Sequence, residues 1–136
     1  MEIELDRFKK AQEGVYEEAL REIRSGRKRT HWMWFIFPQI RGLGYSSTAR
    51  YYEIRGREEA VAYWNDPVLS ARLLEISSAL LKLDNPIRRI MGSPDDMKLR
   101  SCMTLFYLVS GEKTFRDVLD RFYGGAMDEY TIKELA

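Results

Sequence analysis

The stretch HWMWFIF, residues 31–37, decides between an all-helical fold and a mixed one. Its aromatic and β-branched content is typical of a strand. No other segment makes a convincing strand, however, and a lone strand would leave its backbone N–H and C=O groups unpaired. Thr30 is suited to cap a helix, and Pro38 would end one. We therefore expect residues 31–37 to form a short, almost fully buried helix.

Helical patterns lie on both sides of this stretch. From about Leu5 to Ser25, apolar residues recur every three or four positions, which predicts one amphipathic helix that Gly26 ends. Farther along, Asp66 is a typical N-cap, and Pro67 fits the first position of a helix. An apolar stripe makes this the clearest core helix: Leu69, Leu73, Ile76, Leu80 and Leu83.

Helix-start signals recur toward the C-terminus. Ser93 and Asp96 are spaced as a capping box, and so are Thr114 and Asp117. Asp128 is expected to cap a last short helix. Hairpin signals are absent from the sequence, so the sequence predicts an all-α fold.

Composition restricts the class of protein. A chain of 136 residues suits one domain, residues 1–136, and the net charge of +1 provides no global field to attract nucleic acid or a membrane. With one cysteine, Cys102, the chain cannot form an intrachain disulfide, and its one histidine leaves too few ligands for a zinc site. We expect a cytoplasmic protein without metal or cofactor, with no membrane partner and with nucleic acid disfavoured.

Residues 23–52 contain no acidic side chain but six basic ones. Two further features of this segment suit an anion: the Gly42–Gly44 turn lets a ligand approach the backbone closely, and the start of a helix capped by Ser46 or Ser47 offers free N–H groups. The segment therefore predicts an anionic small molecule as partner. The alternative is that its basic residues cap the preceding helix and pair with acids from elsewhere. The basic residues are Arg24, Arg27, Lys28, Arg29, Arg41 and Arg50.

His31 belongs to the side-chain type best suited to exchange protons near neutral pH, so it is a candidate base or donor. The alternative is a structural hydrogen bond at the edge of the core. Trp32 and Trp34 would lie about 200° apart around a helix, so we expect one of them to line a cleft. Such an aromatic wall beside cationic side chains suits a stacked base or a protein partner.

A second polar cluster contains Asp95, Asp96 and Lys98. Adjacent carboxylates suit acid–base work, and the cluster is a candidate for the wall opposite the basic segment. The alternative is structural, because Asp96 fits the capping box and Asp95 is spaced to pair with Lys98 on one helix face.

The leading hypothesis is a module that binds a small ligand of the nucleotide or phosphate type, and the sequence assigns it no reaction. The alternative is a protein-interaction or regulatory module without a small-molecule site. His31 and Asp95 are the candidates for a catalytic role. The candidate ligand-binding residues are Lys28, Arg29, His31, Trp32, Gln39, Arg41, Gly42, Gly44, Ser46, Asp95, Asp96 and Lys98.

Two long blocks, HWMWFIFPQ (residues 31–39) and GSPDDMKLRSCMTLF (residues 92–106, where Cys102 replaces a serine of the family pattern), resemble the domain-of-unknown-function family 1810. These are small bacterial proteins that are sometimes labelled calpastatin. The resemblance extends from about Asp6 to Leu135. It implies a wholly helical fold with packing similar to part of a globin, and it implies no activity and no catalytic residues.

Overall fold

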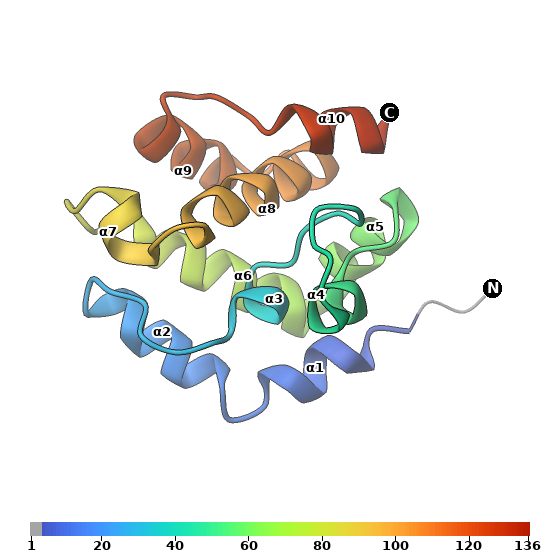
Figure 1. Cartoon of the computed structure of the whole chain (residues 1–136), viewed down its shortest axis with the longest axis horizontal. Coiled ribbons are helices and arrows are strands. Elements are labelled where there is room, and N and C mark those ends of the chain that lie inside the picture. The colour runs from blue at the N-terminus through green and yellow to red at the C-terminus, as the bar shows by residue number, and fades with distance from the viewer. Residues whose placement is uncertain (1–3) are drawn as a thin grey trace.

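Ten helices and no strand form in residues 4–136, the part of the chain that the computed structural model describes (Figure 1). The predicted all-α fold is thus confirmed, whereas the likeness to part of a globin stays a prediction. The helices are α1 (Asp6–Gln12), α2 (Tyr16–Arg24), α3 (Met33–Ile36), α4 (Ser47–Tyr52), α5 (Arg57–Asn65), α6 (Pro67–Leu80), α7 (Ile87–Met91), α8 (Asp95–Ser110), α9 (Lys113–Tyr123) and α10 (Glu129–Leu135).

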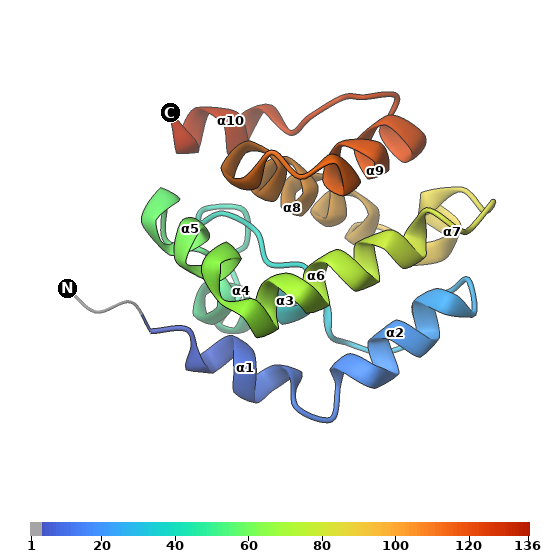
Figure 2. The ribbon, with the colours of Figure 1, turned by 180° about the vertical axis from the view of Figure 1, so that it is seen from behind.

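Helix α6 is the central element, as its apolar stripe predicts. The Asp66 carboxylate accepts hydrogen bonds from the backbone N–H groups of Val68 and Leu69, and Pro67 is the first helical residue. The helix runs between α1 and α2 on one side and α8 to α10 on the other (Figures 1 and 2). It packs against α2, α5 and α9, so both layers bury side chains against it.

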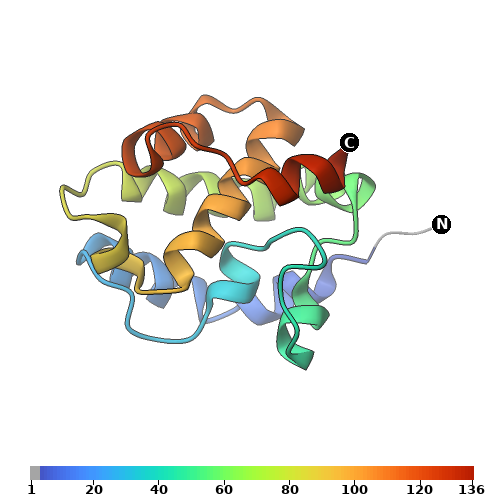
Figure 3. The same ribbon diagram turned by 45° about the horizontal axis from the view of Figure 1, so that its top comes forward.

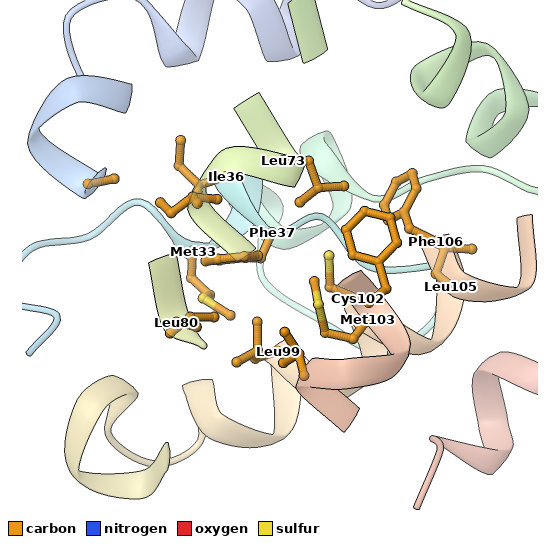
Figure 4. Packing of buried hydrophobic residues seen from close by; sticks show 14 of the residues in the cluster. Met33, Ile36, Phe37, Leu73, Leu80, Leu99, Cys102, Met103, Leu105 and Phe106 are labelled. Carbon is orange, nitrogen blue, oxygen red and sulfur yellow. The ribbon is translucent and has the colours of Figure 1, made fainter. Parts of the chain in front are cut away.

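The core forms where α3, α6 and α8 meet. Met33, Ile36 and Phe37 converge with Leu73 and Leu80 and with the buried face of α8 (Figure 4). Cys102 lies in this cluster, and burial raises the pKa of its thiol well above the usual range, so the thiol stays protonated. Within residues 4–136, no helix combines the length and the apolar character that crossing a membrane requires.

The predicted first helix is two helices. Helices α1 and α2 are separated by a turn at residues 13–15, where Gly14 has φ of +73°. A left-handed residue cannot continue a right-handed helix, and glycine adopts this conformation at little cost. The prediction of one continuous helix from Leu5 to Ser25 is therefore wrong.

Both predicted capping boxes are also wrong. Helix α8 begins at Asp95 without a side-chain cap, and the backbone N–H of Asp96 donates to the Gly92 carbonyl instead. Helix α9 likewise lacks a side-chain cap, and the Asp117 carboxylate accepts from Lys113 at 2.9 Å. Ser93 and Thr114 therefore start no helix through their hydroxyl groups.

The caps predicted at Ser46 or Ser47 and at Asp128 are confirmed, the first of them at Ser46. The Ser46 hydroxyl accepts from the backbone N–H of Ala49 at 3.1 Å, and the Asp128 carboxylate accepts from that of Thr131 at the same distance. These bonds start α4 and α10, the two helices beside the glycine-rich loop.

The HWMWFIF stretch forms a helix in its middle only. Helix α3 has four residues, and Trp32 and Phe37 at its ends are fully buried. His31 precedes the helix and is exposed, so the prediction of burial fails there. Thr30 does not cap α3, because its hydroxyl is bonded elsewhere.

One isolated parallel bridge closes the loop after α3. The backbone N–H of Arg41 donates to the carbonyl of Ile54, and that of Ile54 donates to the carbonyl of Gln39, both at 2.8 Å. The two ends of the segment that contains the glycine-rich loop and α4 are therefore hydrogen-bonded to each other.

Candidate anion-binding clefts

A buried carboxylate organises the loop between α2 and α3. Glu22 lies in the last turn of α2 and is 3% exposed. Its carboxylate accepts hydrogen bonds from the backbone N–H groups of Arg29 (2.6 Å) and Thr30 (3.0 Å), from the Thr30 hydroxyl (2.6 Å) and from the Trp32 indole (3.0 Å). Residues 25–32 therefore wrap around this side chain.

These bonds determine the charge of Glu22. Burial on its own would raise the pKa of the carboxyl, but the bonds from Thr30, Arg29 and Trp32 outweigh it and lower the pKa to about 2. Glu22 is therefore ionised at neutral pH. Its charge is directed at the loop backbone, while the Arg27 and Arg29 side chains of the same loop are exposed.

The α2–α3 loop lies beside α7 (Figure 3), and the backbone N–H of Lys28 donates to the Ile90 carbonyl at 2.7 Å. A cleft of about 920 Å³ opens between these two segments. We call it the basic cleft. It is lined by Ser25, Gly26, Arg27, Lys28, Arg29, Asn85, Pro86, Arg88, Arg89, Met91 and Gly92.

Five cationic residues and no acidic residue line the basic cleft. Within residues 4–136, no salt bridge involves its four arginines, which are Arg27, Arg29, Arg88 and Arg89. Lys28 differs from them, because its side chain is 8% exposed and its ammonium lies 3.0 Å from the Asp95 carboxylate. The four arginines therefore supply the charge of the cleft.

A second cleft, of about 390 Å³, lies between the glycine-rich loop and α10. Arg41 is paired there with Glu134 at 2.9 Å, and the Tyr130 hydroxyl donates to the Arg41 carbonyl at 2.9 Å. A Cβ atom on Gly42 would lie 1.9 Å from the Tyr130 oxygen. We call this the glycine-loop cleft. The Tyr130 side chain therefore lies against the Gly42 backbone, in the position that was predicted for a ligand.

The residues predicted to bind a ligand lie at several separate sites in the structure. Lys28 and Arg29 line the basic cleft, whereas Arg41, Gly42 and Gly44 line the glycine-loop cleft. Ser46 caps α4. Gln39 and Gly44 line a small hollow with Trp34, the half-buried tryptophan. Trp32 is fully buried and bonded to Glu22, so it does not line a cleft wall as predicted.

The second polar cluster is mainly structural. Asp95 lies between two ammonium groups, 3.0 Å from that of Lys28 and 3.6 Å from that of Lys98. Asp95 thereby ties the start of α8 to the α2–α3 loop. In the described part of the chain, no ion pair joins Asp95 to His31, the other candidate for catalysis. One carboxylate oxygen of Asp96 is buried without a hydrogen-bond partner among the residues described.

A comparison with known families gives a match over nearly the whole chain. Residues 2–135 match the family described as "Protein of unknown function (DUF1810)". The chain belongs to this family. It is also similar to the conserved hypothetical protein Rv1873 from Mycobacterium tuberculosis, whose crystal structure was determined at 1.38 Å. The two share 44% identity and a TM-score of 0.93 over 96% of this chain and 94% of that one. A comparison with curated proteins gives no match.

Three residues were not predicted from the sequence: Arg88 and Arg89, which line the basic cleft, and Glu22, which holds its loop. Arg88 and Arg89 follow one another in NPIRRIMG, residues 85–92, a second segment without an acidic residue. The presence of two basic segments without acidic residues could have indicated that they form one site. Glu22 precedes the first of them directly, but nothing in its spacing showed that it turns inward.

Proposed function

We propose that this protein binds a phosphorylated small molecule in the basic cleft. The observation that carries the proposal is the gathering of four arginines from two distant segments in one cleft without an acidic lining residue. Like charges held together repel one another, and a bound anion relieves that repulsion. Guanidinium groups suit phosphate because they donate paired N–H bonds in a planar fork.

The grouping of the unpaired arginines supports this choice. Elsewhere some surface arginines are paired with acids, as in the pairs Arg41–Glu134 and Arg116–Asp120. Others, such as Arg24 and Arg50, are exposed without an ion pair among residues 4–136, but they lie outside the basic cleft. The basic cleft differs because it holds four such arginines together, which favours a partner that is not part of the chain.

Rigid support is the second argument. The Glu22 carboxylate fixes the backbone at Arg29, and the bond from Lys28 to Ile90 fixes the loop against α7. A cleft whose walls are already in place loses less conformational entropy when a ligand binds. The lining contains no histidine, cysteine, aspartate or glutamate, so we propose binding and not catalysis.

Calorimetric titration with pyrophosphate tests the proposal. Arg88→Ala removes one charge-assisted contact, worth about 1.5–3 kcal/mol, so we expect binding to weaken roughly ten- to a hundredfold. Arg41→Ala is the matched control, because Arg41 is an exposed arginine of the other cleft. Absence of pyrophosphate binding at low salt, or equal losses in the two variants, would contradict the proposal.

A further inference from the structure

A groove adjoins the basic cleft at the α6–α7 connection. This adjoining groove has a volume of about 470 Å³ and shares Asn85, Pro86 and Arg88 with the basic cleft. Its remaining lining residues are Asp84, Ile87, Arg121 and Phe122. A ligand bound by Arg88 therefore has room on both sides of that side chain.

The adjoining groove differs in chemistry from the basic cleft. Arg121 donates to the Leu83 carbonyl and to Asp84, and its guanidinium lies over the Phe122 ring at 5.6 Å. These two side chains bring a guanidinium group and an aromatic ring together in the groove. Asp84 is fully exposed beside it and disfavours a phosphate group there.

We propose that the ligand of the basic cleft is a nucleoside phosphate, with its base in the adjoining groove. This inference rests on the proposed function, since it needs the phosphates to be held by the four arginines. A single phosphate carries at most two negative charges, whereas a nucleoside di- or triphosphate carries about three or four, closer to the charge of the cleft. The base then stacks on the surface formed by Arg121 and Phe122.

Asn85 supports the same orientation. It lines both grooves, and its side-chain amide nitrogen lies beside Gly26 of the α2–α3 loop, 3.6 Å from where a Cβ atom on that glycine would stand. An amide both donates and accepts hydrogen bonds, which suits a sugar hydroxyl or the edge of a base. The charged end and the flat end of a nucleotide thus match the two grooves in one direction only.

The test compares the dissociation constants of ADP, pyrophosphate and adenosine by calorimetry. Stacking of a base contributes about 1–3 kcal/mol, so ADP should bind at least about fivefold more tightly than pyrophosphate. The double variant Arg121→Ala/Phe122→Leu removes both flat surfaces and keeps an apolar side chain in place. It should bind ADP no more tightly than pyrophosphate, with pyrophosphate affinity unchanged.

Arg116→Ala is the matched control, because Arg116 is another α9 arginine that lies over an aromatic ring, that of Tyr107, outside both grooves. It should keep the preference for ADP. If the double variant does not fold, Asn85→Ala decides, and it too must reduce the preference. Equal affinities for ADP and pyrophosphate in the unmodified protein overturn this inference alone. Absence of binding by both overturns the proposed function as well.

Discussion

The two arginine-lined clefts of this protein use their charges in different ways. In the glycine-loop cleft, Arg41 is paired with Glu134, and its carbonyl is held by Tyr130. In the basic cleft, the acid that organises the loop, Glu22, bonds to backbone N–H groups and leaves the arginine side chains unmatched. The difference indicates that Arg41 serves the fold and that the arginines of the basic cleft are available to a ligand.

A second buried acid sharpens this contrast. Glu59 is paired with the Arg7 guanidinium at 2.5 Å, and Arg7 also donates to the carbonyls of Tyr51 and Glu53. Glu22 has no ion pair in the described residues, and its partners are neutral donors. Glu22 therefore leaves Arg27 and Arg29 of the basic loop without an ion pair although an acid lies beneath them.

The largest expected effect follows from removal of that acid. Glu22→Ala leaves the N–H groups of Arg29 and Thr30 and the Trp32 indole without their acceptor. An unpaired buried donor costs about 1–3 kcal/mol, and two of these three donors are only partly buried, so we expect a total loss at the low end, about 3–5 kcal/mol in the free energy of unfolding. Urea denaturation measures this loss. Pyrophosphate binding should weaken too, because the loop that carries Arg29 is no longer held.

Glu18→Ala is the control on the same helix. Glu18 is partly exposed and is paired with Arg21 at the surface, so its loss should change stability by less than about 0.5 kcal/mol. If Glu22→Ala were equally mild, the loop would be held by other contacts, and the contrast between the two clefts would lose its physical basis.

Acid pH should weaken the basic cleft for the same reason. The pKa of Glu22 is lowered from its ordinary 4.5 to about 2, so the unfolded chain binds the proton more readily. Ionised Glu22 thus contributes on the order of 3 kcal/mol above about pH 5, and this is lost as the pH falls toward 2. Unfolding free energies measured between pH 6 and 2 test this dependence.

Glu22→Gln isolates this contribution from that of other carboxyl groups. The pKa of Asp66 is also lowered, because the bond from Lys9 and the cap bonds of α6 outweigh the effect of burial, and its contribution is lost in the same direction. The amide of the variant does not titrate, so stability should fall less steeply with acid than in the unmodified protein. Identical slopes would show that Glu22 is not the group responsible.

The fold was predictable where a signal is local. Asp66 with Pro67 starts α6, and Asp128 starts α10, because a cap needs only the residues that follow it. The signal failed where contacts from elsewhere decide the backbone. Ser93 has the right neighbours for a cap, but the N–H of Asp96 finds the Gly92 carbonyl instead. Gly14 was visible, but the apolar pattern continues across it.

The candidate sites show the same division. The positive charge of the loop that contains Arg29 was predictable from the sequence, because the loop belongs to a long stretch without acidic residues. Its partners Arg88 and Arg89 lie on a distant segment, and only the packing of α7 beside that loop brings them together. The glycine turn was interpreted as an approach for a ligand, whereas Tyr130 takes that position.

The smallest expected effect concerns this turn and tests whether the two clefts are independent. Gly42 has φ of +96°, which is strained for a residue with a Cβ atom, and that atom would overlap the Tyr130 hydroxyl. Gly42→Ala should therefore cost about 2 kcal/mol of stability. The Tyr130 side chain must also move, which breaks its hydrogen bond to the Arg41 carbonyl.

A second background separates the two contributions. In a Tyr130→Ala protein the overlap is absent, so Gly42→Ala should there cost only the backbone strain, less than it costs beside tyrosine. Pyrophosphate affinity should be unchanged in both backgrounds, because Arg29 and Arg88 lie in the other cleft. A tenfold loss of that affinity on Gly42→Ala would instead show that the glycine turn is part of the ligand site. The conclusion that the two clefts act independently would then be wrong.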